Sequence, residues 1–240
     1  MGKRLFTITH IFMATVMALL FNACLDETPK DKLEEDKLYT SASNLYINTI
    51  GNLYHQIGGY SDSQGLQGTN RGIYDYNTFS TDEAMLPIRG GDWYDGGFWQ
   101  NLYHHEWTST DLPLLNTWNY LYGSVSLCNH ALYEIDQHKQ LLTDEQYKEH
   151  TAEARGLRAL FYFYIMDMWG NVPLVMQEGV TLEDVKQSTR KKVTTTLINE
   201  LLAAIPYLPN AHSNHEGNYY GRFTRPVAYF LLAKILLNHE

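Results

Sequence analysis

Aromatic, amide and charged side chains are concentrated between Pro87 and Thr108. A sugar ring has an apolar face of C–H groups and a rim of hydroxyl groups. A site for it therefore needs a flat aromatic surface with planar polar groups beside it. This segment contains both kinds of group, and its arginine can form two parallel hydrogen bonds with one partner. The side chains predicted to bind a ligand are Arg89, Asp92, Trp93, Tyr94, Trp99 and Asn101.

The rings of this segment have a second interpretation. The pairs Gly90-Gly91 and Gly96-Gly97 let the backbone turn sharply and come close to a ligand. The same aromatic side chains could instead pin a long loop onto neighbouring helices. For Trp93 and Trp99 the sequence leaves both interpretations open.

Hydrolytic chemistry has little support in the sequence. A glycosidase needs two carboxylates about 5–5.5 Å or about 6.5–9.5 Å apart across the bond that is cleaved. Asp82 and Glu83 are adjacent, so their side chains diverge. We therefore predict that the chain is not an enzyme and has no catalytic residues.

The ten histidines do not complete a metal-binding pattern. The run 104–106 (His-His-Glu) lacks the second histidine of a zinc protease helix. His150 and Glu153 share a helix face, but such a pair is only half of a carboxylate-bridged site. No metal site and no cofactor are predicted.

Apolar residues recur at helical spacing in several stretches. Thr143, followed by Gln146, forms a capping box at the start of one helix, and Gly170 ends that helix. Cys128 occupies an apolar helical position, so we expect a buried side chain rather than a catalytic thiol. The predicted helices cover residues 43–58, 118–135, 143–170, 193–208 and 226–235.

Residues 58–113 show neither a helical nor an alternating period. This stretch is too long for an ordinary connection and too aromatic for a disordered one, so it is predicted to be an ordered loop. The last four helices form two helix–turn–helix units, which bury their apolar faces by stacking. The predicted fold is mainly α, a tetratricopeptide-like helical repeat with long irregular loop insertions.

The N-terminus has the order of charges and apolar residues that is typical of an export signal. Lys3 and Arg4 precede an apolar run from Ile11 to Phe21, which is shorter than the ~20 residues that a membrane span needs. Ala23-Cys24 then resembles a lipobox, so Cys24 is the predicted lipidation site; the alternative is an ordinary signal peptide with a chance cysteine.

Residues 1–23 are assigned to the signal peptide and residues 24–40 to a tether. The remaining domain, residues 41–240, is expected to be truncated at its C-terminal end, because no capping helix follows the last predicted helix.

The charge of the chain argues against one class of partner. The formal net charge is −9, and no basic stripe is present that could neutralise phosphates. Nucleic acid is therefore not an expected partner.

Three segments together resemble the SusD/RagB-like family of outer-membrane nutrient-binding lipoproteins. They are residues 80–84 (STDEA), residues 152–174 (AEARGLRALFYF running on to WGNVPL) and residues 221–225 (GRFTR). The second is the most specific of the three. With the lipobox-like cysteine and the acidic tether, the similarity covers nearly the whole chain.

The resemblance implies a protein that binds a glycan or related nutrient and delivers it to a SusC-like, TonB-dependent outer-membrane transporter. It implies attachment to the outer membrane through a lipid on Cys24, with Asp26-Glu27 similar to the family's signal for export to the cell surface. It also implies that aromatic and polar residues between Pro87 and Thr108 contribute to the glycan site. Family members are longer, and their C-terminal half also contributes to ligand binding. The alternatives are a glycoside hydrolase fragment and a helical-repeat scaffold that binds protein without binding glycan.

Overall fold

The computed structural model describes residues 38–59, 61, 63–66 and 71–238. The chain divides into two units, Met1–Leu38 and Tyr39–Glu240, and all but one of the described residues belong to the second. The predicted signal peptide, the lipidation site Cys24 and the tether as far as residue 37 lie outside the described residues.

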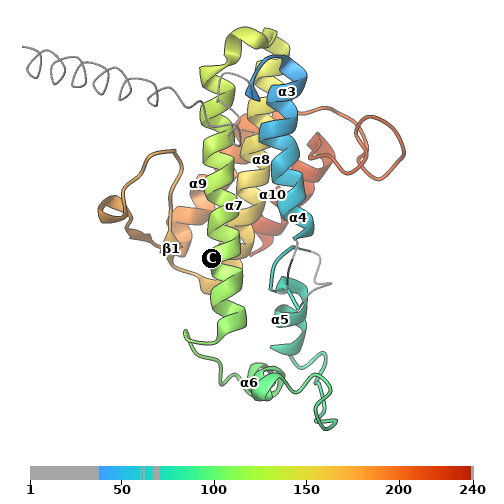
Figure 1. The fold of residues 1–240 in the computed structure, drawn as a ribbon, viewed down its shortest axis with the longest axis vertical. Helices are drawn as coiled ribbons and strands as arrows, with labels where there is room; N and C mark the ends of the chain where they lie inside the picture. The colour runs from blue at the N-terminus through green and yellow to red at the C-terminus, as the bar shows by residue number, and fades with distance from the viewer. Residues whose placement is uncertain (1–37, 60, 62, 67–70, 239–240) are drawn as a thin grey trace, which may run out of the picture. The chain divides into compact units, whose positions relative to one another are not determined.

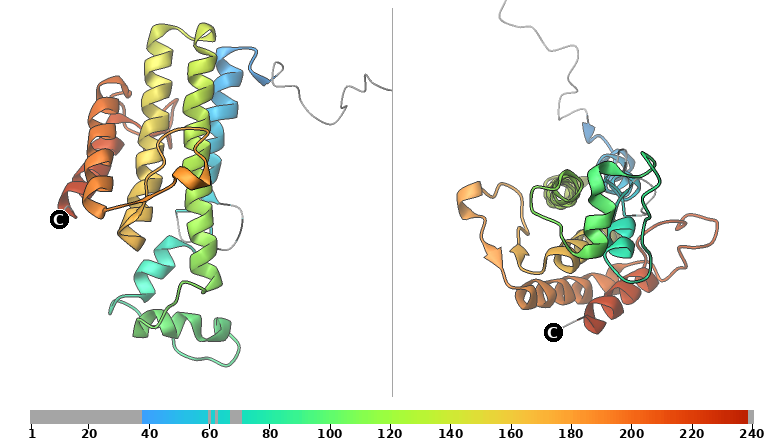
Figure 2. Two further views of the ribbon diagram at one scale, coloured as in Figure 1. Left: turned by 90° about the vertical axis from the view of Figure 1, so that its left-hand side faces the viewer. Right: turned by 90° about the horizontal axis from the view of Figure 1, so that it is seen from below.

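Long helices form the body of the second unit (Figure 1). Helix α8 lies between α7 and α9, and α10 packs against α9 (Figure 2). A further helical stretch runs beside α7 and consists of two α-helices joined by a π-helical turn. In chain order these elements are α3 (Ala42–Tyr46), the π-helical turn (Ile47–Gly51), α4 (Asn52–Gly58), α7 (Leu112–Gln137), α8 (Asp144–Trp169), α9 (Arg190–Ala204) and α10 (Arg225–Leu237).

The core lies along α8, which buries apolar side chains on several sides. Leu157, Phe161 and Ile165 of this helix are fully buried among residues of α7, α9 and α10. Cys128 of α7 is buried in the same cluster, as predicted. The mainly α fold, with the helix pairs α7–α8 and α9–α10 and long insertions, confirms the predicted fold class.

The helix ends follow local capping chemistry. Thr143 accepts a hydrogen bond from the backbone N–H of Gln146, whose side chain in turn accepts one from the backbone N–H of Thr143, so the predicted capping box is present. Gly170 ends α8 with a positive φ of 70°. The first helix begins after Ser41, whose hydroxyl accepts the N–H of Asn44 at 3.2 Å, and so starts earlier than predicted.

The stretch predicted to be a loop without regular structure contains two short helices, α5 (Ile73–Phe79) and α6 (Phe98–His104), with a 3-10 turn (Asp95–Gly97) before the second. Each α-helix has seven residues, fewer than two full turns, which is too short to show a helical period. They share a small apolar cluster at one end of α7, whose buried members are Tyr76, Phe98, Trp99 and Leu102.

The connection after α8 contains the only two strands among the described residues. β1 (Val172–Pro173) pairs antiparallel with β2 (Gln187–Ser188). Further 3-10 turns cover Lys139–Leu141, Leu182–Asp184 and Ile205–Tyr207. Within the described part of the chain, no helix combines the length and apolar character that a membrane crossing requires.

A buried ionic cluster fixes the connection between α9 and α10 to the rest of the body. The carboxylate of Glu153 is fully buried and accepts two hydrogen bonds from Arg222, at 3.1 and 2.6 Å. The hydroxyl groups of Tyr46 and Tyr54 donate to the same carboxylate. Tyr54 also accepts the backbone N–H of Phe223 at 2.6 Å.

Two further contacts strengthen these attachments. Gly156 lies under the ring of Phe223, so closely that an added Cβ would stand 2.2 Å from the ring. Arg158 of α8 pairs with Glu200 of α9 and donates to Asn129 of α7 at 2.7 Å. Glu153 thus attaches α8 to the connection before α10, and Arg158 attaches α8 to α7 and α9.

Candidate ligand-binding site

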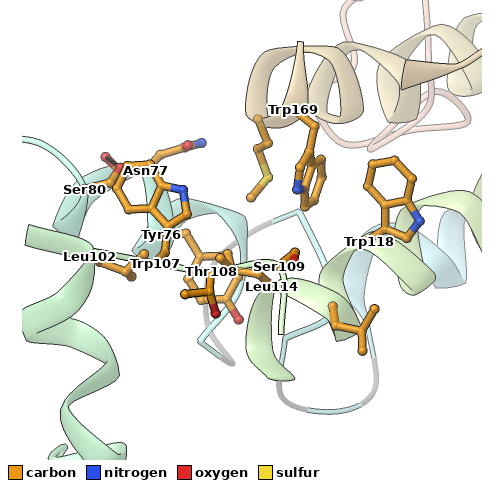
Figure 3. A pocket seen from close by; sticks show the side chains of 12 residues that line it. Tyr76, Asn77, Ser80, Leu102, Trp107, Thr108, Ser109, Leu114, Trp118 and Trp169 are labelled. Carbon is orange, nitrogen blue, oxygen red and sulfur yellow. Dashed lines mark hydrogen bonds between the residues drawn. The ribbon is translucent and has the colours of Figure 1, made fainter. Parts of the chain in front are cut away.

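A pocket of about 510 Å³ opens where α5, α6, the start of α7 and the end of α8 meet (Figure 3). This volume is within the range of ~300–1,000 Å³ that is typical of small-molecule sites. The lining consists of aromatic, aliphatic and uncharged polar side chains: Tyr76, Asn77, Ser80, Leu102, Trp107, Thr108, Ser109, Leu114, Leu115, Trp118, Met168 and Trp169.

Three indole rings form the walls of the pocket. Figure 3 shows Trp107 on one side and Trp118 and Trp169 on the other. The rings of Trp118 and Trp169 are perpendicular, with centroids 5.1 Å apart. Trp107 is 45% exposed, so its ring offers a large apolar surface to a ligand.

Contacts outside the pocket hold its walls in place. Trp118 packs against Tyr122, whose hydroxyl donates to the carbonyl of Pro173 at 2.8 Å, and burial raises the pKa of Tyr122 above its ordinary value. The hydroxyl of Tyr76 donates to Ser63 at 2.9 Å. A ligand would therefore meet rings that are already in position, which lowers the entropy cost of binding.

Polar groups lie beside the rings. The hydroxyl of Ser80 donates to the carbonyl of Asn77 at 3.4 Å, and the backbone N–H of Thr108 donates to Asp111 at 2.7 Å. Asn77, with Ser109, adds further side-chain donors and acceptors to the lining. The pocket thus combines ring surfaces with neutral hydrogen-bonding groups, the combination that a sugar requires.

One predicted ligand-binding residue has a different role in the structure. Trp99 is only 1% exposed and packs among Tyr76, Phe79 and Phe98. Its indole N–H donates to the carboxylate of Asp95 at 2.6 Å. The expectation that Trp99 presents an exposed platform is therefore corrected: this ring holds the α5–α6 cluster together.

The other predicted residues are not among those that line the pocket. Arg89 and Asp92 form an exposed ion pair at 3.0 Å across a tight turn. Trp93 rests partly buried against Trp99, and Tyr94 is exposed. Asn101 lies partly buried in α6, outside the lining. Ligand contact by these five residues stays a prediction.

None of the three pocket tryptophans is among the residues predicted to bind a ligand. Trp107 lies in the segment between Pro87 and Thr108, Trp118 lies in a predicted helix, and Trp169 lies in the segment that carries the family resemblance. A signal was nevertheless present. Two consecutive helices of equal length with a short connection run antiparallel, so a residue near the start of the first lies beside the end of the second.

The chain resembles several known proteins. Residues 65–237 match the SusD-like family described as "Starch-binding associating with outer membrane". A SusD-like protein of Bacteroides ovatus is 28% identical over 244 residues, which cover 98% of this chain and 40% of that protein. The chain thus spans 40% of the length of this curated relative.

Solved structures give a similar result. A structure described as a laminarin binding SusD-like protein is 25% identical with a TM-score of 0.67, covering 83% of this chain and 40% of that one. The surface glycan-binding protein A from Bacteroides uniformis has the same fold, with 24% identity, a TM-score of 0.63 and coverage of 82% and 41%.

Proposed function

This chain belongs to the SusD-like family, and from that premise we propose that it binds a glycan in the pocket walled by Trp107, Trp118 and Trp169. The observation that carries the proposal is the union, in one pocket, of three indole rings with uncharged hydrogen-bonding side chains. Aromatic surfaces pack against the C–H faces of sugars, and the neutral polar groups replace water at the hydroxyl rim.

We further propose that binding occurs without cleavage. Neither Asp nor Glu is among the described residues that line the pocket, so the pair of carboxylates that glycosidases use is not found there. The relatives named above as laminarin binding and glycan-binding support the same assignment.

The cellular role that we propose follows from the family. The chain would be held at the outer membrane by a lipid on Cys24, face the cell surface and pass its glycan to a SusC-like, TonB-dependent transporter. Support comes from the family description, which names association with the outer membrane, and from the lipobox-like Ala23-Cys24.

Truncation of one pocket ring tests the glycan site. In affinity electrophoresis through laminarin and soluble starch, Trp107→Ala is expected to weaken retention roughly 2–12-fold, because one aromatic contact is worth about 0.5–1.5 kcal/mol. Tyr133→Ala is the matched control, since Tyr133 lies outside the pocket and is 47% exposed, close to the 45% of Trp107.

Three results would contradict the proposal in distinguishable ways. Equal retention of Trp107→Ala and the wild type on a glycan that binds would place the site elsewhere. Release of reducing sugar from the glycan by the purified protein would favour the alternative that the chain is a glycoside hydrolase fragment. Association with the transporter without retention on any glycan would favour a protein-binding scaffold.

A further inference from the structure

The pocket contains no charge of its own. None of the described residues that line it is Asp, Glu, Lys, Arg or His. Its polar side chains are those of Asn77, Ser80, Thr108 and Ser109, with the phenol of Tyr76 engaged by Ser63. Any anionic group that entered would lose water without meeting a cation, and the desolvation of an unpaired charge is strongly unfavourable.

The chain segments that supply the lining are rich in acidic residues. Residues 72–84, 98–118 and 159–170, the segments that supply the lining, contain no Lys or Arg, and their only basic side chains are His104 and His105. Asp111 accepts the backbone N–H of a lining residue, Thr108. The acidic residues of these segments are Asp75, Asp82, Glu83, Glu106, Asp111 and Asp167.

The arginines on either side of α5 do not offset this charge. Arg71 pairs with Asp95 at 3.5 Å and lies over the ring of Trp93. Arg89 pairs with Asp92 at 3.0 Å. Each of these two arginines is thus paired with a carboxylate, so neither adds a net positive charge.

We propose that the pocket selects uncharged glycans and rejects those that carry carboxylate or sulfate groups, an inference that rests on the proposed glycan-binding function. A neutral sugar ring can satisfy its hydroxyl groups with the amide and hydroxyl side chains of the lining. An acidic sugar of the same shape meets an uncharged pocket with the carboxylate of Asp111 bonded to the lining residue Thr108, and the repulsion between like charges acts over the screening length of about 8 Å at physiological ionic strength.

Matched ligands that differ only in charge test this selectivity. Laminarin and soluble starch are each compared with the same polymer oxidised at C6 to the carboxylate, and with the methyl ester of that oxidised form. The measurement is made at pH 8, where histidine side chains in general are uncharged. The carboxylated forms are expected to bind at least roughly tenfold more weakly, and esterification is expected to restore most of the affinity.

A charge introduced into the pocket gives a second, independent measurement. Asn77 is an exposed lining residue of α5. Asn77→Lys is expected to raise the affinity for the carboxylated polymer, relative to the affinity for the neutral polymer, several-fold. Asn77→Gln, which is similar in size to asparagine and uncharged, should leave this affinity ratio at the wild-type value. The increase in this affinity ratio for Asn77→Lys should be smaller in 0.5 M salt, because counterions screen the attraction between the introduced lysine and the carboxylate of the polymer.

The outcomes separate this inference from the function on which it rests. Equal or tighter binding of the carboxylated forms would overturn the selectivity while leaving glycan binding in place. The selectivity would also be overturned if the carboxylated polymer bound weakly and its methyl ester bound equally weakly. The size of the added group, rather than its charge, would then be the cause. Failure to bind both the neutral and the charged polymers would overturn the proposed function and the selectivity together.

Discussion

Aromatic rings and polar groups meet in two regions of this molecule, and the results differ. Around Glu153 the carboxylate is fully buried, and the rings of Tyr46 and Tyr219 lie against the guanidinium of Arg222, at 5.1 and 5.2 Å from their centroids. At the meeting of α5, α6, α7 and α8 the rings instead border an open cavity, and the polar groups beside them are neutral. The first region joins elements of the fold, and the second keeps aromatic surface available to a ligand.

The electrostatics of the Glu153 region show how completely its groups engage one another. Burial and the neighbouring Glu153 raise the pKa of Tyr54 well above its ordinary value, because both disfavour a second negative charge. Burial alone would lower the pKa of Arg222, yet its hydrogen bonds and ion pairing with Glu153 raise it. Polar groups that bond to one another in this way have few donors and acceptors free for a ligand. A cluster of charged and aromatic residues therefore does not by itself indicate a binding site.

The largest predicted effect tests whether this ionic cluster stabilises the fold and nothing more. Glu153→Ala is expected to lower the free energy of unfolding by about 3–5 kcal/mol, because it leaves the guanidinium of Arg222 without its buried partner. Chemical denaturation measures the loss. Glycan retention per folded molecule should not change, since the cluster lies outside the pocket.

Glu149 provides the control for this variant. It also pairs with Arg222, at 3.0 Å, but its side chain is partly exposed. Glu149→Ala is therefore expected to cost at most about 1 kcal/mol. If the two variants lost equal stability, burial would not be the difference between the two carboxylates.

A somewhat smaller effect is predicted at the corrected position, Trp99. Trp99→Ala should cost about 3 kcal/mol, near the lower limit for buried tryptophan, because the neighbouring pocket gives the α5–α6 cluster room to collapse. Trp107→Ala should change stability by less than about 0.5 kcal/mol, since that ring is half-exposed. Thermal unfolding of the two variants side by side measures both. A stability loss that was larger for Trp107 than for Trp99 would reverse the roles assigned here.

The smallest predicted effect concerns pH. Burial lowers the pKa of His150, and the positive charge of Arg222 lowers it further, against the opposing effect of Glu153. A histidine whose pKa is lower in the folded state contributes stability above its unfolded pKa of about 6.5, and that contribution is lost as the pH falls through the folded pKa. His150→Gln should therefore lose less stability than the wild type between pH 7 and pH 5. A steeper loss in the variant would show that His150 gains a proton on folding instead.

Much of the fold follows from local sequence. The capping box of Thr143 with Gln146 and the stop at Gly170 fix both ends of α8, and apolar spacing placed Cys128 inside the core. Such features depend on neighbours within one or two turns, so a single sequence reveals them. The short helices α5 and α6 escaped prediction because tertiary packing rather than periodicity stabilises them.

The sequence by itself determined the mainly α fold, the family resemblance and the aromatic character of the region near the site. Only the tertiary structure decided which tryptophans line a pocket: Trp99 is buried, while Trp107, Trp118 and Trp169 come together from segments up to about sixty residues apart. It likewise paired Glu153 with Arg222, 69 positions along the chain. The physical reason is that spacing fixes the face of a helix on which a residue lies, whereas burial depends on what other segments place against that face.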